Sequence, residues 1–341
     1  SDGHVRLSEV DGLDLDTARS IDRIIIVACG TASYAGDIAK YGIEKWARIP
    51  VQVELSHEFR YRDPILTPNT LVVAISQSGE TMDTLMATRY AKEQGAKVLA
   101  ICNTQGATLA RESDAVIYTH AGPEVAVAST KALTAQITAG YLLGLLLAQL
   151  RQSLPAAQLA ELGKELLRMP ARVTKVIEDL DTAKQLGRKL ADSKSVLFLG
   201  RNVGFPVAME GALKLKELAY IHAEGFAAGE LKHGPIALIE EGQPVIVIVP
   251  SPREADSLHP KVISNIQEIR ARGAKVVAIA EESDNQVAQY AEDVIYIPQS
   301  QSIFSPILAV IPLQAFAMEL STAKGLDVDQ PRNLAKSVTV E

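Results

Sequence analysis

Short, uninterrupted apolar runs recur along the chain, and helix-like stretches follow most of them. The runs cover residues 24–28, 71–75, 98–101, 115–118, 196–199, 245–249, 276–279 and 294–297. Such runs are typical of strands that are buried on both faces of a parallel sheet. The intervening stretches 33–46, 81–93, 131–150 and 207–220 have helical composition. This alternation predicts doubly wound α/β domains, with helices on both faces of a parallel sheet as in flavodoxin-like and Rossmann-like folds.

The same pattern occurs twice in the chain. Residues 95–101 read GAKVLAI and residues 273–279 read GAKVVAI, which gives six identities in seven positions at an offset of 273 − 95 = 178. An acidic residue and another β-rich run follow each copy. We therefore predict two copies of one α/β domain, residues 20–165 and 186–328, and a distinct C-terminal tail, residues 329–341.

Composition and charge exclude several classes of protein. The 341 residues include 34 Lys and Arg against 41 Asp and Glu, so the net charge is −7. That balance disfavours a broad nucleic-acid surface but leaves room for a small anionic ligand in a local positive pocket. With 47% hydrophobic and 22% charged residues, the chain has the composition of a globular protein.

Neither the cysteines nor the longest apolar stretch changes this interpretation. Cys29 and Cys102 form no disulfide framework and no zinc spacing, and we expect both to be small buried residues. Residues 132–148 are apolar but interrupted by Thr134, Gln136 and Thr138, which predicts a buried helix rather than a membrane span. Without a signal peptide, we expect a soluble, cytoplasmic protein.

The sharpest local motif is Ser-Gln-Ser-Gly-Glu-Thr at residues 76–81. It lies where a predicted buried strand ends and a helix begins, so hydroxyl groups and helix N-terminal N–H groups can converge there on a phosphate. The alternative is an ordinary helix-capping sequence. The first strand is followed by Cys29-Gly-Thr-Ala-Ser33, and the second domain opens with Gly200-Arg-Asn-Val-Gly204. Neither has the GxGxxG spacing of a dinucleotide site.

Three further positions could carry chemistry. Lys214 and Glu217 are three residues apart, so they share one helix face. They could be a general base and its neighbouring amine, or they could form an ordinary surface ion pair. His233 lies in a predicted loop, Gly229–Pro235, and could be catalytic or simply solvated. Lys336 lies in a tail that would ordinarily fray.

Taken together, these motifs closely resemble one family, the isomerase half of the glucosamine-6-phosphate synthases, with tandem sugar isomerase (SIS) domains. The motifs are CGT at 29–31, SQSGET at 76–81, VASTK at 127–131, LKLKE at 213–217, ELKHGP at 230–235 and PRNLAKSVTVE at 331–341. The resemblance covers essentially the whole chain, and the closing eleven residues are its most specific part.

The resemblance implies that the chain acts on fructose 6-phosphate in making glucosamine 6-phosphate, without a metal or other cofactor. It implies that Ser76, Gln77, Ser78 and Thr81 bind phosphate and that Thr31, Val127 and Ser129 contact the sugar. Glu217 would move a proton between C1 and C2 with Lys214 beside it, and Lys336 would form a Schiff base with the open ketose. His233 would open the sugar ring in the active site of a neighbouring subunit, which implies a homodimer.

Two departures from the family pattern matter. The glutaminase domain that precedes the isomerase half in this family is missing, so we expect no use of glutamine. Ala32 stands where many relatives have a serine, and Ser33 is the nearest replacement. Two alternatives stay open: a fructosamine-phosphate deglycase of the same SIS type, and a non-catalytic SIS sugar-phosphate sensor. The sensor alternative predicts the serine loop without Glu217, His233 and Lys336.

Overall fold

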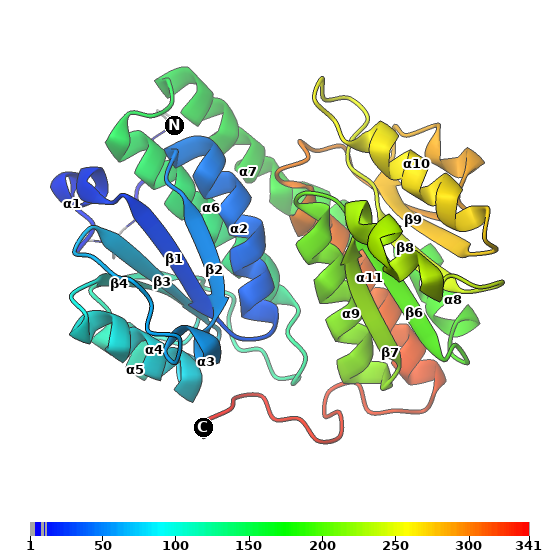
Figure 1. Cartoon of the computed structure of the whole chain (residues 1–341), viewed down its shortest axis with the longest axis horizontal. Helices are drawn as coiled ribbons and strands as arrows, with labels where there is room; N and C mark the ends of the chain where they lie inside the picture. The colour runs from blue at the N-terminus through cyan, green and yellow to red at the C-terminus, as the bar shows by residue number, and fades with distance from the viewer. Residues whose placement is uncertain (1–3, 8–9, 11, 341) are drawn as a thin grey trace. The chain divides into compact units, whose positions relative to one another are not determined.

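A computed structural model of the chain describes residues 4–7, 10 and 12–340 (Figure 1). The chain divides into two compact units. The first comprises Ser1–Val125, Ser129–Leu167 and Ala335–Glu341, and the second comprises Ala126–Ala128 and Arg168–Leu334. The end of the predicted tail therefore belongs to the first unit.

The first unit is built on a five-stranded parallel sheet. Its strands are β1 Arg23–Ala28, β2 Val51–Leu55, β3 Thr70–Ser76, β4 Lys97–Cys102 and β5 Ala115–Tyr118. They are arranged in the order β2-β1-β3-β4-β5, and every neighbouring pair is parallel. This is the flavodoxin-like order, in which the chain switches direction across the sheet between β1 and β3. Ligands of such sheets bind beyond the carboxyl ends of those two strands.

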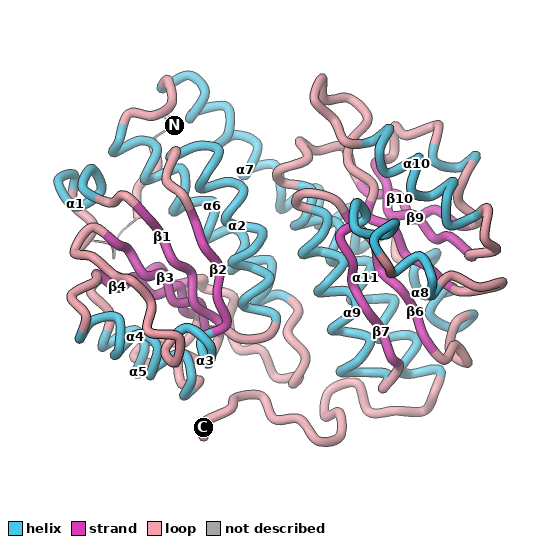
Figure 2. Tube along the Cα trace, in the orientation of Figure 1, coloured by secondary structure: helices cyan, strands magenta, loops and turns pink. Residues whose placement is uncertain are grey.

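Helices cover both faces of this sheet (Figures 1 and 2). They are α1 Leu15–Ser20, α2 Thr31–Ala47, α3 Ser56–Phe59, α4 Met82–Glu93, α5 Thr108–Glu112 and α6 Lys131–Arg151, with α7 Ala156–Glu178 running on into the second unit. Side chains alternate along β1 because the side-chain period of a strand is two. Ile25 and Val27 pack with Phe59 and Leu85 on one face, whereas Ile26 meets α2 at Gly36 on the other.

The second unit repeats this architecture. Its strands are β6 Ser195–Gly200, β7 His222–Ala227, β8 Pro244–Ile248, β9 Lys275–Glu281 and β10 Asp293–Ile297. The order β10-β9-β8-β6-β7 is the order of the first sheet read from the opposite edge, and all pairs are again parallel. The prediction of tandem doubly wound domains with parallel sheets is therefore confirmed.

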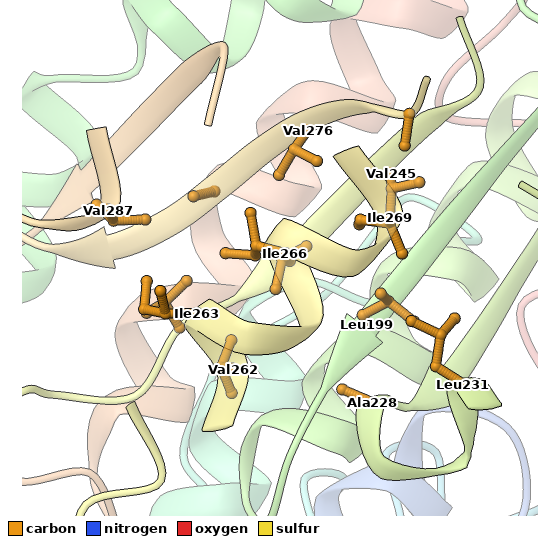
Figure 3. Close-up of a cluster of buried hydrophobic side chains, with 14 of the residues drawn as sticks. Leu199, Ala228, Leu231, Val245, Val262, Ile263, Ile266, Ile269, Val276 and Val287 are labelled. Carbon is orange, nitrogen blue, oxygen red and sulfur yellow. The ribbon is translucent and has the colours of Figure 1, made fainter. Parts of the chain in front are cut away.

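Helices also flank the second sheet. They are α8 Asp181–Lys189, α9 Gly204–Ala219, α10 His259–Arg270 and α11 Ser305–Ala323, with short 3₁₀ turns η1 Ala228–His233, η2 Pro235–Leu238 and η3 Val287–Gln289. Figure 3 shows one core, in which Val262, Ile266 and Ile269 of α10 pack against Val245 and Val276 of the sheet. On the other face, Gly211 of α9 lies close to Phe198 of β6.

All eight predicted strands are present, and two further strands, β2 and β7, were not expected. Both lie at an edge of their sheet, and in each only one residue is fully buried. Edge strands need no continuous apolar run, so the criterion of burial on both faces missed them. The predicted loop at 229–235 is also more regular than expected, because η1 and η2 occupy most of it.

Two helices, α6 and α11, are long and apolar enough to span a membrane among the described residues. Most of each apolar window is buried inside the protein, at 67% for α6 and 72% for α11. In α6, Tyr141 is fully buried and packs edge to face on Trp46 of α2, with ring centroids 5.5 Å apart. The prediction of a buried helix over 132–148 is confirmed, and both helices are core helices of a soluble fold.

Candidate active site

The serine-rich motif forms the turn between β3 and α4, beyond the carboxyl end of a central strand. Ser76 is buried; its Oγ accepts a hydrogen bond from the Gly79 N–H at 3.0 Å and lies 3.4 Å from the Thr81 hydroxyl. The Ser78 Oγ accepts the Glu80 N–H at 3.2 Å. Thr81 is the N-cap residue of α4, yet it makes no side-chain capping hydrogen bond. Thr81 therefore does not cap α4 with its side chain, whereas Ser76 and Ser78 accept N–H groups of the turn itself.

Gly79 permits the tight turn of this loop. Its φ is +68°, a left-handed conformation that favours glycine. A Cβ added there would lie 2.5 Å from the Ala107 Cβ and 2.7 Å from the Cys102 Sγ. Cys102 is fully buried next to Gly79, as expected of a small buried residue, and burial raises the pKa of its thiol to about 11. The other cysteine, Cys29, is only partly buried at the end of β1.

The C-terminal tail lies against this loop within the first unit. The Ser337 hydroxyl is 3.1 Å from the Ser78 hydroxyl, and the Val338 carbonyl accepts the N–H of Met82, the first residue of α4. The Lys336 Nζ is 3.3 Å from a carboxylate oxygen of Glu124. The tail is therefore docked rather than frayed, and its lysine lies one residue from the contact with the serine loop.

Glu124 is a residue that sequence reasoning missed. Its carboxylate is 4% exposed and also accepts the Ser129 hydroxyl at 3.2 Å. Burial raises the pKa of Glu124, but hydrogen bonds from Thr130 and the charge of Lys336 outweigh burial and hold this pKa below its ordinary value. The available signal was a single acidic residue in an otherwise uncharged stretch, residues 121–130.

The other predicted sugar contacts lie near strand or helix ends. Thr31 is buried as the first residue of α2, directly after β1. Val127 belongs to a short segment that packs with the second unit, where its N–H donates to the Asp329 carbonyl at 3.0 Å. The Ser33 hydroxyl donates to the Gly30 carbonyl at 2.7 Å, so it is engaged in the first turn of α2. The Gln77 carbonyl accepts the Asn103 N–H.

In the second unit, α9 carries a line of three charged side chains. Lys214 is 1% exposed and pairs with Glu217, three residues later, and with Glu210, four residues earlier, at 3.5 Å. Burial lowers the pKa of Lys214, but the two carboxylates outweigh burial and raise it. Glu210 is also 1% exposed, whereas the Glu217 side chain is 23% exposed. A surface ion pair is therefore excluded: Lys214 is an internal ammonium, and Glu217 is the carboxylate with access to solvent. The i, i+4 spacing from Lys214 was the signal for Glu210, which sequence reasoning missed.

A cavity of about 490 Å³ opens beside Glu217. Its lining comes from the end of α9 and from the tail: Lys216, Glu217, Tyr220, Ile221, His222, Arg332, Asn333 and Leu334. The Tyr220 hydroxyl accepts the Arg332 N–H at 2.7 Å, and the Arg332 guanidinium lies 4.2 Å above the Tyr220 ring. This contact fixes the start of the tail next to Glu217.

His233 ends η1 and is exposed to solvent, 16 positions after Glu217. Its side chain therefore lies on the surface of the second unit. Among the described residues, no group of three or more His, Cys, Asp and Glu side chains is arranged to hold a metal ion.

Comparison with known proteins places this geometry in context. Residues 19–146 and 189–324 match the SIS domain family. Glutamine–fructose-6-phosphate aminotransferase (isomerizing) from Leifsonia xyli is 66% identical over 341 residues, which are 100% of this chain and 55% of that protein. The Corynebacterium glutamicum protein of the same name is 66% identical over 334 residues, 97% of this chain and 54% of that protein. The chain thus spans about half the length of the curated relatives it matches.

Solved structures give the same result. The C-terminal domain of glucosamine-fructose-6-phosphate aminotransferase from Francisella tularensis superposes with a TM-score of 0.90 at 39% identity, covering 97% of this chain and 92% of that one. Glucosamine-6-phosphate deaminase from Thermotoga maritima has a TM-score of 0.75 at 23% identity, covering 93% of this chain and 90% of that one, a likeness of fold alone.

Proposed function

Because this chain belongs to the SIS domain family, and within it to the C-terminal domains of the glutamine–fructose-6-phosphate aminotransferases, we propose that it binds fructose 6-phosphate and isomerises it between ketose and aldose. In the complete enzyme this chemistry would yield glucosamine 6-phosphate. The observation that carries the proposal is the docked tail, which holds Lys336 close to a hydroxyl-rich loop at the switch point of the first sheet.

The serine loop would bind the phosphate. Ser76, Ser78 and Thr81 supply hydroxyl donors, Gln77 lies between them, and the positive end of the α4 dipole favours a dianion there. Thr31, Val127 and Ser129 would contact the sugar hydroxyls. Because relatives at 66% identity carry the aminotransferase name, a hexose 6-phosphate is the anion that fits best.

The reaction needs three further groups. His233 would open the sugar ring as a general acid and base. The Lys336 amine, once neutral, would attack the C2 ketone, and loss of water from the adduct would leave a Schiff base. After water or ammonia has displaced Lys336 from C2, Glu217 would take a proton from C1 and return it to C2, which gives glucose 6-phosphate from the ketone or glucosamine 6-phosphate from the imine. The buried Lys214 ammonium supports this role, because it holds the Glu217 carboxylate at one orientation on α9.

A matched pair of measurements tests phosphate binding. Ser78→Ala should weaken the affinity for fructose 6-phosphate by about 1–3 kcal/mol in calorimetry, since a hydrogen bond to a charged group is lost. Ser113→Ala, whose hydroxyl donates to the Leu109 carbonyl at the end of α5 and not to a residue of the loop, should bind as the parent does. An unchanged affinity of Ser78→Ala would contradict the assignment.

We also propose a homodimer in which His233 serves the active site of the neighbouring subunit, and a glutaminase domain as the partner that supplies ammonia. Mixed dimers of His233→Ala and Glu217→Gln would then contain one intact site and regain up to about half of the activity. Mixed dimers no more active than the single variants would contradict a shared site. We also propose a cytoplasmic location, because the chain belongs to this family of biosynthetic enzymes.

The deglycase and sensor alternatives have less support. A sensor needs no proton-transfer machinery, yet Lys214 and Glu210 are buried beside the solvent-accessible Glu217 at considerable desolvation cost. The deglycase alternative has no observation in its favour beyond the shared fold.

A further inference from the structure

One carboxylate oxygen of Glu124 binds the N-terminal end of α6, and the other contacts the C-terminal tail. Oε1 accepts the Thr130 N–H at 2.7 Å, the Thr130 hydroxyl at 3.0 Å and the Ala132 N–H at 3.4 Å. Oε2 accepts the Ser129 hydroxyl at 3.2 Å and faces the Lys336 Nζ at 3.3 Å. Thr130 is the N-cap residue of α6 but makes no capping bond with its own side chain, so Glu124 provides the cap from outside the helix.

Because of this arrangement, the ion pair of Lys336 with Glu124 stabilises the docked tail more than a surface ion pair would. Surface ion pairs contribute little because both partners are solvated and mobile. Here the Glu124 side chain is 4% exposed and is fixed by its bonds to α6, whereas the Lys336 side chain is 26% exposed. A buried carboxylate that loses its cation leaves a desolvated charge behind. Release of the tail therefore costs more than loss of an exposed pair.

We propose that Glu124 is a positioning residue for Lys336: it holds the lysine at the N-terminus of α6 and keeps the tail docked on the serine loop before substrate arrives. The inference rests on the proposed function in assigning chemistry to Lys336, but the docking itself does not depend on that assignment. Because Ser129 donates to the same oxygen, the carboxylate also joins a predicted sugar contact to the lysine.

Digestion of the substrate-free protein by carboxypeptidase tests the docking. Removal of Val338 and Ser337, followed by intact mass, requires the tail to leave its position, because these two residues contact the serine loop and α4, and so reports the open population. Glu124→Gln keeps one carbonyl oxygen for the α6 cap but presents an NH₂ group, which cannot accept, to Lys336. We expect about tenfold faster digestion, or about 1.4 kcal/mol. Glu112→Gln, which removes an exposed pair with Arg89, is the matched control and should digest at the parent rate.

Variants of the lysine separate the ion pair from the helix cap. Lys336→Met removes the cation without altering α6 and should speed digestion as much as Glu124→Gln does, with no further increase in the double variant. Lys336→Arg keeps the cation and should digest at nearly the parent rate. Equal digestion of the parent, Glu124→Gln and Lys336→Met would overturn the proposal.

A readout with substrate separates this inference from the proposed function. Borohydride reduction with fructose 6-phosphate should label Lys336 in the parent, label it more slowly in Glu124→Gln, where the carboxylate no longer holds the lysine, and leave Lys336→Arg unlabelled although its tail is docked. If the parent is not labelled while the digestion pattern holds, the proposed imine is wrong and the docking role stands. Labelling of Glu124→Gln at the parent rate would overturn the positioning role.

Discussion

The substitution Gly79→Ala tests whether the serine loop is shaped as described. The alanine would have to adopt a φ of +68°, which costs an L-residue about 1–2 kcal/mol. Its Cβ would also lie 2.5 Å from the Ala107 Cβ and 2.7 Å from the Cys102 Sγ, closer than real contacts allow. Overpacking of this kind typically costs about 1–3 kcal/mol. We therefore expect a total loss of about 2–5 kcal/mol in the free energy of unfolding.

Gly95→Ala separates the two contributions. Gly95 has a φ of +84°, but nothing lies within 4 Å of a Cβ added there. This variant carries the backbone strain without the clash and should lose only about 1–2 kcal/mol. The difference between the two variants thus measures the packing of the loop against Cys102 and Ala107.

Urea unfolding followed by circular dichroism gives both values, provided that each variant unfolds cooperatively. Calorimetry with fructose 6-phosphate should then show at least tenfold weaker binding for Gly79→Ala, because the clash displaces the loop, and parent affinity for Gly95→Ala. If Gly79→Ala is no less stable than Gly95→Ala and binds normally, the reasoning about this loop is wrong.

Two other positions give independent predictions. Burial raises the pKa of Asp37 on α2 to about 6, so its ionisation opposes folding, and this group's contribution to stability is lost as pH rises from about 4 through 6. The shift corresponds to about 3 kcal/mol, or about 1–2 kcal/mol after allowance for solvent screening. In urea unfolding, Asp37→Asn should therefore raise the free energy of unfolding by about 1–2 kcal/mol at pH 8 and leave it unchanged at pH 4. No gain at pH 8 would contradict the burial argument. Lys214→Met should lose about 3–5 kcal/mol in the same assay, because it takes the cation away from the buried Glu210 and from the partly exposed Glu217. A loss below about 1 kcal/mol would mean that these carboxylates do not depend on Lys214.

The sequence was most informative where a single physical requirement governs a residue type. Buried central strands need continuous apolar runs, so β1, β3, β4 and their counterparts in the second unit could be recognised. The edge strand His222–Ala227 could not, because its pattern is half polar and its pairing comes from β6 rather than from its own residues. Its position depends on the sheet as a whole.

In the candidate site, too, the local features could be predicted from the sequence, whereas the contacts between distant residues could not. The serine loop and the Lys214–Glu217 spacing are local, and the sequence placed them correctly on a strand–helix turn and a helix face. The partners of Lys336 are not local: Glu124 is 212 positions away, and no periodic pattern links the two residues. The burial of Lys214 could not be predicted either, because a spacing of three residues from Glu217 fits an exposed ion pair as well as the internal one observed.

Proton transfer at Glu217 is the central claim, and solvent deuterium incorporation tests it directly. The chain is incubated with fructose 6-phosphate in D₂O, and deuterium at C1 of the ketose and C2 of the aldose is followed by NMR. We expect the parent to incorporate deuterium and to form glucose 6-phosphate. Glu217→Gln should do neither, because an amide cannot accept the proton. This variant should still bind the sugar phosphate in calorimetry. Incorporation by a folded Glu217→Gln at a rate near that of the parent would show that another group moves the proton.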